Sequence, residues 1–419
     1  MDNVFIKREI IAIDLKSFFA SCECVERGLD AFKVPLVVCD PHRNGAITLA
    51  VSPYLKKLGV PGRCRVYELP KNIKILKVPP RMNLYIKKSK EVLSIYLEFV
   101  ASEDMHVYSI DEVFIDVTDY LKMYKMTSLE LAKTILKRIK DKTGLTATAG
   151  IGPNLLMAKV AMDIEAKHTP DNIAVWTYDD VQSKLWNITP LSKMWGIGSR
   201  LEKRLNKLGL FKIGDIACYS KNKLKEKFGV IGEELWNHAN GIDLAKIHDY
   251  NYAPKDKSMS HSQILFKDYD ENNIMLIIKE MIDVLTKRLR ENKKHTSLIG
   301  LGIGYSKSIG GGFYHMQKLD AATDDANLIY NICESIFDRY YEYLPIRKVS
   351  LCYGKLSDNV GVQLNLFETY EEVTLKKQEN EAIDKIKNKF GANSILKASS
   401  LLADSTAKAR NKKIGGHSA

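Results

Sequence analysis

The chain has 419 residues, of which 45% are hydrophobic, and its 63 basic and 51 acidic side chains leave a formal net charge of +12. This length predicts two to four domains rather than one, and the hydrophobic fraction provides ample material for packed cores. The moderate positive excess is compatible with a soluble protein that meets a polyanion on one face. Basic solvent-exposed helices give the same total, so the charge alone decides nothing.

Seven cysteines are scattered along the chain, and Cys22 and Cys24 form the only close pair. No second pair completes a zinc site, so we expect reduced thiols in a cytosolic protein. The amino-terminal segment is too short and too charged for a signal peptide. No apolar run approaches the roughly 18 residues that a membrane span needs. We therefore expect a cytoplasmic protein without a membrane partner.

Short strands and helices alternate over residues 8–176. We predict strands at 8–14, 34–39 and 146–152, and helices at 17–26, 81–99 and from Pro153 or Asn154 onward. Thr127 and Glu130 have the spacing of a capping box, and apolar residues then recur at helical spacing. This pattern predicts a sheet with helices on one face.

The composition changes after this region. Residues 186–241 are predicted to be wholly helical, in short pieces, and the polar stretch 249–258 is typical of a linker. Beyond it the expected order is β-α-β-β-α-β, a ferredoxin-like arrangement. After Ser357 the chain is polar, and we expect it to be mobile, with one apolar island at 362–367.

The stretch YSIDEVFIDV places two carboxylates, Asp111 and Glu112, next to each other in a predicted strand. Neighbouring strand residues point to opposite faces, so the two acids can converge only where the strand bends. Alone, the pair is explained by a solvated turn. Asp14, at the end of the first strand, adds a third acid. Three carboxylates at one sheet edge fit two hard cations and in-line phosphoryl transfer.

Four segments together carry a resemblance: IAIDLKSFFASCE, YSIDEVFIDV, WGIG and the terminal ILKASSLLADSTAKARNKKIGGH. In this order the chain resembles the Y-family translesion DNA polymerases, in particular the UmuC-like branch with its UvrX/ImpB/MucB/SamB-type bacterial UV-damage repair members. The resemblance implies a multidomain α/β (α+β) right-hand polymerase. It would have a ferredoxin-like palm, small fingers, an all-helical helix-hairpin-helix thumb and a β-α-β-β-α-β little finger that lies in the DNA major groove.

The resemblance also divides the chain into expected domains. These are a palm (1–25 and 80–178), fingers (26–79), a helical thumb with the helix-hairpin-helix (179–245), a linker (246–257), a DNA-binding little finger (258–356) and a tail with a sliding-clamp-binding peptide (357–419).

By resemblance, Asp14, Asp111 and Glu112 are the catalytic carboxylates that would bind two Mg²⁺ ions, with the carbonyl of Leu15 as a further ligand. Lys16 stands where members of the DinB-like branch often have a second acid. Only three side-chain carboxylates therefore remain, and Lys16 is left out of the metal set.

The same comparison assigns the nucleotide-binding residues. Phe19 matches the steric gate that collides with a ribose 2′-hydroxyl, whereas one of the two adjacent phenylalanines must belong to the core. Phe18 and Ser17 would lie near the triphosphate. Lys56 and Lys167 match the phosphate-binding basic residues, although each is also a plausible surface lysine. Pro53 stands where several members carry an aromatic residue, so this chain departs from the family pattern in the fingers, next to the predicted phosphate-binding Lys56.

Two further motifs concern partners. Gly196, Ile197, Gly198, Ser199 and Arg200 match a helix-hairpin-helix turn that binds a DNA phosphate through bare backbone N–H groups; a tight turn between helices is the structural alternative. In the tail, the residues that resemble a bacterial sliding-clamp peptide are Gln363, Leu364, Leu366 and Phe367. A strand docked on the protein's own surface is the alternative there.

The resemblance implies an error-prone, template-directed DNA polymerase that performs translesion synthesis past damaged DNA without a proofreading exonuclease. It would act as a monomer on primer–template DNA and an incoming deoxynucleoside triphosphate. A catalytically degenerate scaffold that binds damaged DNA and the sliding clamp is the alternative, although all three acids are present. A nucleotidyl cyclase, which uses similar acids, has no place for the hairpin turn or the clamp peptide.

Overall fold

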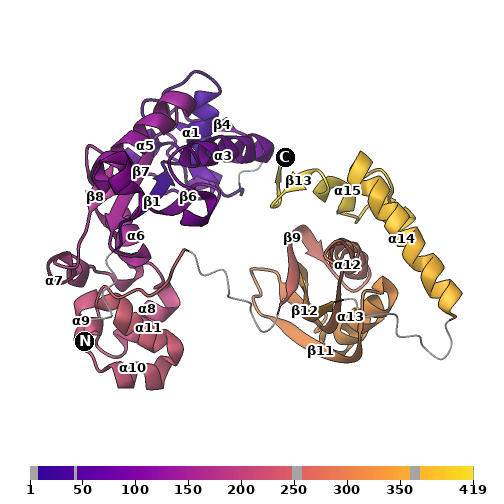
Figure 1. Cartoon of the computed structure of the whole chain (residues 1–419). Helices are drawn as coiled ribbons and strands as arrows, with labels where there is room; N and C mark the ends of the chain where they lie inside the picture. The colour runs from indigo at the N-terminus through magenta and orange to yellow at the C-terminus, as the bar shows by residue number, and fades with distance from the viewer. Residues whose placement is uncertain (1–7, 42–44, 248–256, 359–368, 419) are drawn as a thin grey trace. The chain divides into compact units, whose positions relative to one another are not determined.

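The computed structural model describes residues 8–41, 45–247, 257–358 and 369–418. The chain divides into two compact units, one formed by residues 1–251 with 417–419 and the other by 252–416 (Figure 1). Within the described ranges, no helix has the length and the apolar character to cross a membrane.

A five-stranded sheet with the order β5-β6-β1-β7-β8 forms the centre of the first unit. Its strands are β5 (Met105–Val107), β6 (Glu112–Asp116), β1 (Ile10–Leu15), β7 (Ala147–Gly152) and β8 (Ile173–Val175). The central strand β1 pairs antiparallel with β6 and β7. This register places Asp14 directly opposite Glu112. The expected strands at 8–14 and 146–152 are therefore confirmed, within one or two residues.

Helices cover both faces of this sheet, so the prediction of helices on one face was wrong. Ile11 and Ile13 pack in a core with α1 (Phe18–Val25), α3 (Met82–Tyr96) and α5 (Ser128–Thr143). Ile10 and Ala12 point the other way and pack against α6 (Leu155–Ile164). The physical reason lies in β1 itself. Both of its alternating sets of residues are apolar, so each face has to be covered.

Two glycines allow α6 to lie directly on β7. A Cβ atom at Gly150 would stand 2.1 Å from the carbonyl oxygen of Ala158, and one at Gly152 would stand 2.6 Å from the nitrogen of Ala158. Any side chain at these positions would push the helix away. The start of α6 is fixed by Asn154, whose side chain accepts a hydrogen bond from the Met157 N–H at 2.8 Å.

A small second sheet with the order β3-β2-β4 belongs to the expected fingers. The predicted capping box at Thr127 and Glu130 is confirmed at the start of α5. The remaining elements of the first unit are β2 (Leu36–Val38), β3 (Ala50–Val51), α2 (Pro53–Lys57), β4 (Leu76–Val78), α4 (Tyr120–Tyr124), α7 (Asp180–Ser183), α8 (Ser199–Asn206), α9 (Ile213–Cys218), α10 (Lys221–Phe228), α11 (Val230–Ala239), β14 (His417–Ser418) and the 3₁₀ turns η1 (Val66–Glu68), η2 (Ser102–Asp104), η3 (Ala166–His168), η4 (Leu185–Asn187) and η5 (Leu191–Lys193).

The second unit contains the expected β-α-β-β-α-β order, folded as a sheet β11-β10-β12-β9. Its elements are β9 (Met259–Tyr269), α12 (Ile274–Glu291), β10 (Lys294–Tyr305), β11 (Gly312–Thr323), α13 (Ala326–Tyr340) and β12 (Ile346–Asp358). Ile299, Leu301 and Leu351 face the two helices and belong to the core of this unit. The alternate residues of each strand form the opposite, helix-free face.

The expectation of a mobile tail was wrong for the described residues after 368. The chain continues as α14 (Tyr370–Phe390), η6 (Ala398–Leu401), α15 (Ala407–Arg410) and β13 (Lys413–Ile414). Asp384 on α14 accepts two hydrogen bonds from Arg290 on α12, at 2.7 and 3.1 Å. The buried Glu280 accepts hydrogen bonds from the backbone and hydroxyl of Thr406. These ion-pair and polar contacts make the segment part of the second unit.

Candidate active site

The three predicted carboxylates come from two neighbouring strands of the first unit. Asp14 follows Ile10 and Ala12 on the face of β1 that α6 covers, and Glu112 lies opposite it at the start of β6. Asp111 occupies the bend before β6, where the Ser109 hydroxyl donates a hydrogen bond to Asp111 Oδ1 at 2.7 Å. The Leu15 N–H donates to the Asp111 carbonyl at 3.0 Å. The fold therefore brings the three acids to one end of the sheet.

Two lysines and a fourth acid contact these carboxylates. Lys159 Nζ lies 2.7 Å from Glu112 Oε1 and 2.9 Å from Asp163 Oδ2, both within ion-pair distance. Lys167 Nζ lies 2.8 Å from Asp163 Oδ1 and 3.1 Å from Asp14 Oδ2. Lys167 was predicted to bind phosphate, but Lys159 and Asp163 were not singled out. Their four-residue spacing on one helix was the signal that could have found them.

The acids are held in an environment that disfavours their charge. Burial raises the pKa of Asp14, and repulsion from Asp111 adds to this, while Lys167 lowers it. Burial likewise raises the pKa of Glu112 against the lowering effect of Lys159. Glu112 Oε1 is buried, and the Lys159 ammonium group lies 2.7 Å from it. A carboxylate oxygen in this state is suited to a cation ligand.

The donor chemistry fits a hard divalent cation, since it consists of carboxylate oxygens together with a backbone carbonyl. Within the described ranges, however, no three Asp, Glu, His or Cys side chains are grouped so that they could share one ion. The ion pairs explain this difference: Glu112 is turned toward Lys159, and Asp14 toward Lys167. Cation binding would require these side chains to exchange partners.

The two phenylalanines of the FFAS segment have different surroundings. Phe18 is 2% exposed and packs in the core, so it is the core aromatic that the sequence required. Phe19 is half-buried and its ring stacks on Tyr85, with 4.5 Å between centroids and 16° between planes. Ser17 stands at the N-cap position of α1 without a capping side-chain hydrogen bond, and its backbone is left-handed with φ of 49°. This bend separates β1 from the helix that carries Phe19.

The predicted phosphate-binding lysines lie on the same side as the acids. Burial alone would lower the pKa of Lys167, but Asp14 and Asp163 outweigh it and raise this pKa. Lys56 lies on α2 and is exposed. Desolvation of its ammonium group by the neighbouring protein lowers its pKa. Asp14 and Asp111 act on Lys56 in the opposite direction, so the three groups lie within electrostatic range.

A buried carboxylate cluster supports Tyr85 beneath Phe19. The Glu23 side chain is 0% exposed; it accepts hydrogen bonds from Tyr85 Oη at 2.7 Å and from Arg81 at 2.7 and 3.0 Å, and it contacts Arg27. Burial alone would raise the pKa of Glu23, but these donors outweigh it and hold the pKa below its ordinary 4.5. The cluster therefore fixes the ring on which the predicted gate stacks.

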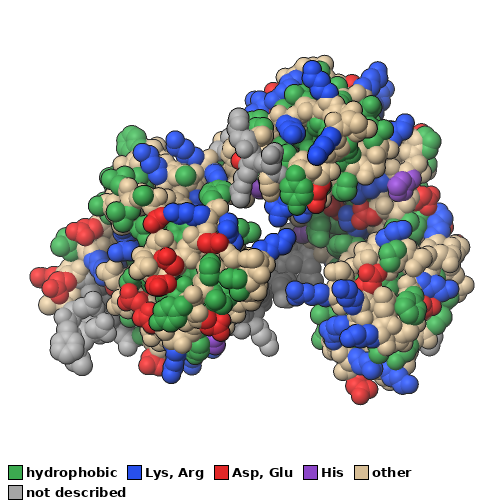
Figure 2. Space-filling view, turned by 180° about the vertical axis from the view of Figure 1, so that it is seen from behind, with side chains coloured by type: hydrophobic (Ala, Val, Ile, Leu, Met, Phe, Trp, Pro, Cys, Tyr) green, Lys and Arg blue, Asp and Glu red, His purple; other side chains and the backbone are tan. Residues whose placement is uncertain are grey.

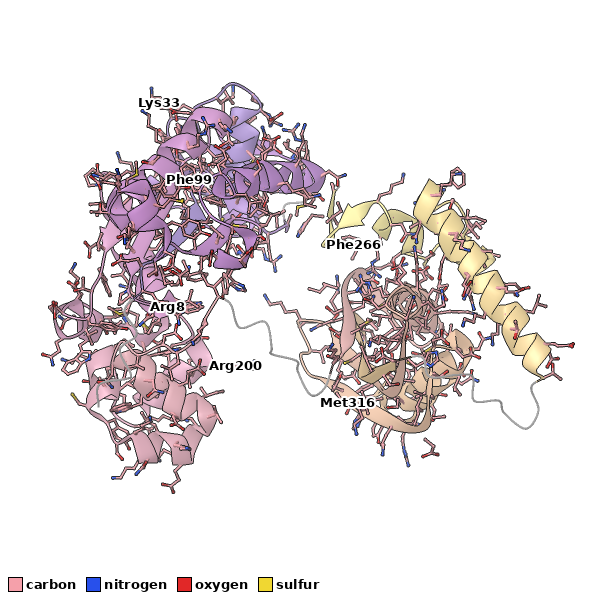
Figure 3. The ribbon with its side chains drawn as sticks, viewed as in Figure 1. Arg8, Lys33, Phe99, Arg200, Phe266 and Met316 are labelled. Carbon is pink, nitrogen blue, oxygen red and sulfur yellow. The ribbon has the colours of Figure 1, made fainter. Side chains whose placement is uncertain are left out.

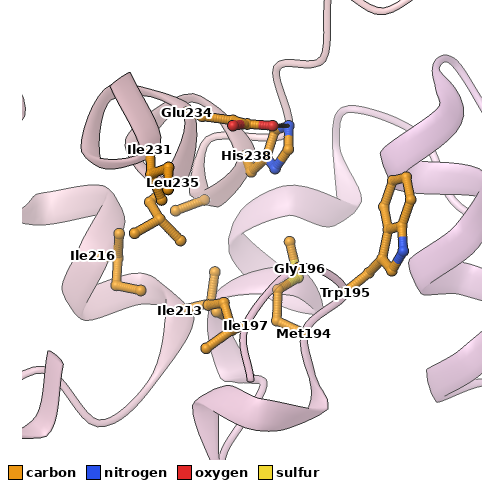
Figure 4. Close-up of a pocket in the computed structure, with 11 residues that line it drawn as sticks. Met194, Trp195, Gly196, Ile197, Ile213, Ile216, Ile231, Glu234, Leu235 and His238 are labelled. Carbon is orange, nitrogen blue, oxygen red and sulfur yellow. Dashed lines mark ion pairs between the residues drawn. The ribbon is translucent and has the colours of Figure 1, made fainter. Parts of the chain in front are cut away.

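The helix-hairpin-helix turn leaves its backbone accessible. Gly196 has a φ of 87°, which requires glycine, and a Cβ at Gly198 would meet nothing within 4 Å. Among the described residues, no side chain caps the start of α8, and Arg200 lies exposed there (Figure 3). Ile197 is buried and lines a cavity of about 230 Å³ that Glu234 and His238 also line, with His238 Nε2 3.8 Å from Glu234 Oε1 (Figure 4). Burial of the Ile197 side chain holds the turn against the interior of the protein.

The remaining predicted site residues cannot be placed. Gln363, Leu364, Leu366 and Phe367 lie outside the described residues.

Replacing Glu23 by glutamine should lower the free energy of unfolding by about 2 kcal/mol at neutral pH, because two arginines lose their buried partner. The folded-state pKa of Glu23 lies below 4.5, so its contribution to stability is fully present above pH 4.5, begins to fall below that pH and is lost as the pH falls through the folded-state pKa. Denaturant unfolding at pH 7 and near pH 3.5 measures this.

Glu98→Gln is the control, because Glu98 pairs with Arg138 and Lys142 on the surface. It should leave the midpoint at pH 7 nearly unchanged. A difference between wild type and Glu23→Gln that persists unchanged at low pH would contradict the assigned role.

Comparisons with known proteins cover most of the chain. Residues 13–163 match the impB/mucB/samB family, residues 178–210 match the helix-hairpin-helix motif of this family, and residues 256–366 match its C-terminal domain. UvrX of Bacillus subtilis (strain 168), a relative named for UV-damage repair, is 38% identical over 420 residues, which cover 99% of this chain and 98% of the relative.

Two further matches agree with this result. The protein named DNA polymerase IV 2 of the same organism is 31% identical and covers 98% of this chain and 99% of its own. A solved Y-family DNA polymerase chimera, Dbh-Dpo4(243-245)-Dbh, has a TM-score of 0.66 at 22% identity and covers 84% of this chain and 100% of that chain, which shows a shared fold. The chain therefore belongs to the impB/mucB/samB family of Y-family translesion DNA polymerases.

Proposed function

We propose that the protein is an error-prone, template-directed DNA polymerase that copies past damaged bases by two-metal phosphoryl transfer and without proofreading. One observation carries this proposal: antiparallel pairing of β1 with β6 sets Asp14 opposite Glu112 and beside Asp111, at the end of a sheet where two lysines also converge. We expect the enzyme to act as a monomer in the cytoplasm.

The acids would hold two Mg²⁺ ions, with the Leu15 carbonyl as an additional ligand. When bound, these ions activate the primer 3′-hydroxyl and stabilise the charge of the leaving pyrophosphate. Lys167 would contact the triphosphate once it leaves Asp14, and Lys56 would contact it from α2. Ser17 and Phe18 begin the helix that would meet the phosphates through its backbone N–H groups.

Phe19 would select the sugar. The Phe19 ring stacks on Tyr85, and the Tyr85 hydroxyl donates a hydrogen bond to Glu23. The Phe19 ring therefore has a fixed partner behind it and cannot easily move away from an incoming nucleotide. A rigid ring under the sugar collides with a ribose 2′-hydroxyl and tolerates a deoxyribose. This is a steric form of substrate discrimination.

DNA would be held by contacts that do not depend on sequence. The open backbone around Gly198 and the exposed Arg200 are suited to a phosphate. On the face drawn in Figure 2, basic and acidic side chains are interspersed, so net charge alone does not outline a DNA path. The contacts must therefore be assigned residue by residue.

In the second unit, the helix-free face of the sheet is the expected DNA surface. The register places Lys318 opposite Leu298 and Lys348 opposite Gly304, and both exposed lysines lie on this face. His315 instead faces the helices and stacks on Tyr340 at 3.5 Å. Arg347 pairs with Asp268, and the tail residue Arg410 contacts His261. We therefore expect the two lysines to contribute more to DNA binding than the two histidines or Arg347.

A sliding clamp is the proposed protein partner. The support for it is the sequence of the QLNLF segment alone. Residues 359–368 connect β12 to α14, and both elements belong to the second unit. Such a segment would tether the enzyme to DNA and raise its local concentration there.

Replacing Asp111 by alanine should reduce Mg²⁺-dependent primer extension by about a thousandfold, equivalent to about 4 kcal/mol of transition-state stabilisation, because a metal-bound carboxylate is lost. Primer extension with purified protein measures this. Asp141→Ala, which changes an exposed acid on α5, is the control. A wild-type protein that binds primer–template but extends nothing would instead support the scaffold hypothesis.

Replacing Phe19 by alanine should raise ribonucleotide insertion relative to deoxynucleotide insertion by about 10-fold to 100-fold, the range expected when one steric contact is lost. Single-nucleotide insertion kinetics with paired ribo- and deoxynucleotides measure the ratio. Phe32→Ala, at an exposed aromatic residue, should leave it unchanged. Unaltered sugar selectivity in Phe19→Ala would show that the gate is misassigned.

Alanine at Gln363, Leu366 and Phe367 together should abolish the stimulation of synthesis by a bacterial sliding clamp while sparing synthesis on DNA alone. Substitution is preferable to deletion, because deletion would shorten the connection between β12 and α14. Extension assays with and without the clamp measure both activities. An equal loss in the two assays would assign the segment a structural role.

A further inference from the structure

Five side chains of alternating charge form a continuous series in the first unit, which we term the charge chain: Glu112, Lys159, Asp163, Lys167 and Asp14. Each contact within it is between 2.7 and 3.1 Å. Asp163, in the middle, contacts one lysine through each of its two oxygens. The two ends of the charge chain are proposed metal ligands, and the centre has no role in the function derived above.

The two lysines differ in their access to solvent. The Lys159 side chain is 8% exposed, whereas that of Lys167 is 37% exposed. A cation that approaches Asp14 and Glu112 repels both ammonium groups and competes with them for the same oxygens. Lys167 can turn toward water or an incoming triphosphate. Lys159 is enclosed, so it needs another anion nearby, because an unpaired buried charge is strongly unfavourable.

Asp163 is placed to be that anion. Positions 159 and 163 are one helical turn apart on α6, so their contact depends only on the helix itself. The position of α6 is fixed in turn by its direct packing on Gly150 and Gly152. Lys159 can therefore give up Glu112 without losing Asp163. Lys167 lies four residues after Asp163, in the 3₁₀ turn η3, and contacts the other oxygen of the same carboxylate.

We propose that Asp163 is a positioning residue that retains Lys159 and Lys167 while metal ions take over Glu112 and Asp14. This inference rests on the proposed function. In the absence of metal, the two lysines offset part of the negative charge of the acids. When cations arrive, Asp163 keeps Lys159 paired and leaves Lys167 anchored within reach of the triphosphate.

Two substitutions should then change metal affinity in opposite directions. Asp163→Asn leaves both lysines dependent on Glu112 and Asp14, so cations must displace them without compensation, and binding should weaken about tenfold. Lys159→Met releases Glu112 and removes a competing charge, so binding should strengthen. The double variant removes one charge of each sign and should return to within about threefold of wild type.

The experiment is a titration of the full chain with Mn²⁺, followed by electron paramagnetic resonance of the free ion, without DNA or nucleotide. Mn²⁺ that still binds to the Asp111→Ala variant measures ions held outside the proposed metal site. Asp180→Asn is the control, because Asp180 on α7 pairs with Lys184, just after that helix, at the same four-residue spacing and away from the catalytic acids. It should bind Mn²⁺ like wild type. Circular dichroism confirms that each variant is folded.

Weaker binding by Asp163→Asn with recovery in the double variant supports the proposal. Unchanged affinity in Asp163→Asn overturns it, as does an equal loss in Asp163→Asn and Lys159→Met, which a merely structural role would give. If Lys159→Met does not fold, Asp163→Asn alone decides, since that side chain is 28% exposed and less constrained. A wild-type protein that fails to extend primers would refute the proposed function without altering these affinities.

Discussion

Mutual repulsion among acids at one end of a sheet is the constraint on which the first unit depends. At about 4 Å, two like charges near a protein surface repel by about 4 kcal/mol at an effective dielectric constant of about 20. Asp14, Asp111 and Glu112 therefore cannot stand together without nearby positive charge. The fold supplies it from α6 and the turn that follows, through Lys159 and Lys167. The two lysines thus offset part of the negative charge in the absence of metal, and cations exchange with lysines that are already in place.

This compensation depends on a backbone packing contact directly beside Lys159. The helix that carries Lys159 reaches the sheet because Gly150 and Gly152 present no side chains to it. Asn154 fixes where the helix begins, and helical periodicity then directs residues 159 and 163 toward the acids. The positions of these two side chains therefore depend on the backbone contact, on where the helix begins and on the spacing along the helix. A shift of one residue in this register would rotate the lysines away from the acids.

Sequence patterns predicted the strands, the acids and the order of the second unit, because alternation and motif spacing report these features directly. The four-residue spacing of Lys159 and Asp163 indicates that pair, but nothing in the sequence indicates that Lys159 also contacts Glu112 on strand β6. Nor did sequence patterns show that Ile10 and Ala12 need a helix of their own. The basic residues of the second unit could be sorted only from the strand register, since His315 and Lys318 lie on opposite faces of one strand. The docking of α14 was missed because charged contacts such as Asp384 with Arg290 hold it to α12.

The docked carboxyl-terminal segment determines what a truncated form of this protein would lose. A frameshift or premature stop codon between β12 and α14 would leave every proposed catalytic residue intact. It would nevertheless strip Thr406 from Glu280 and Asp384 from Arg290, and so leave one charge of each sign without its partner on the surface of α12. Such a shortened product would carry the chemistry but expose a damaged helix face, which makes it a candidate for proteolysis or aggregation.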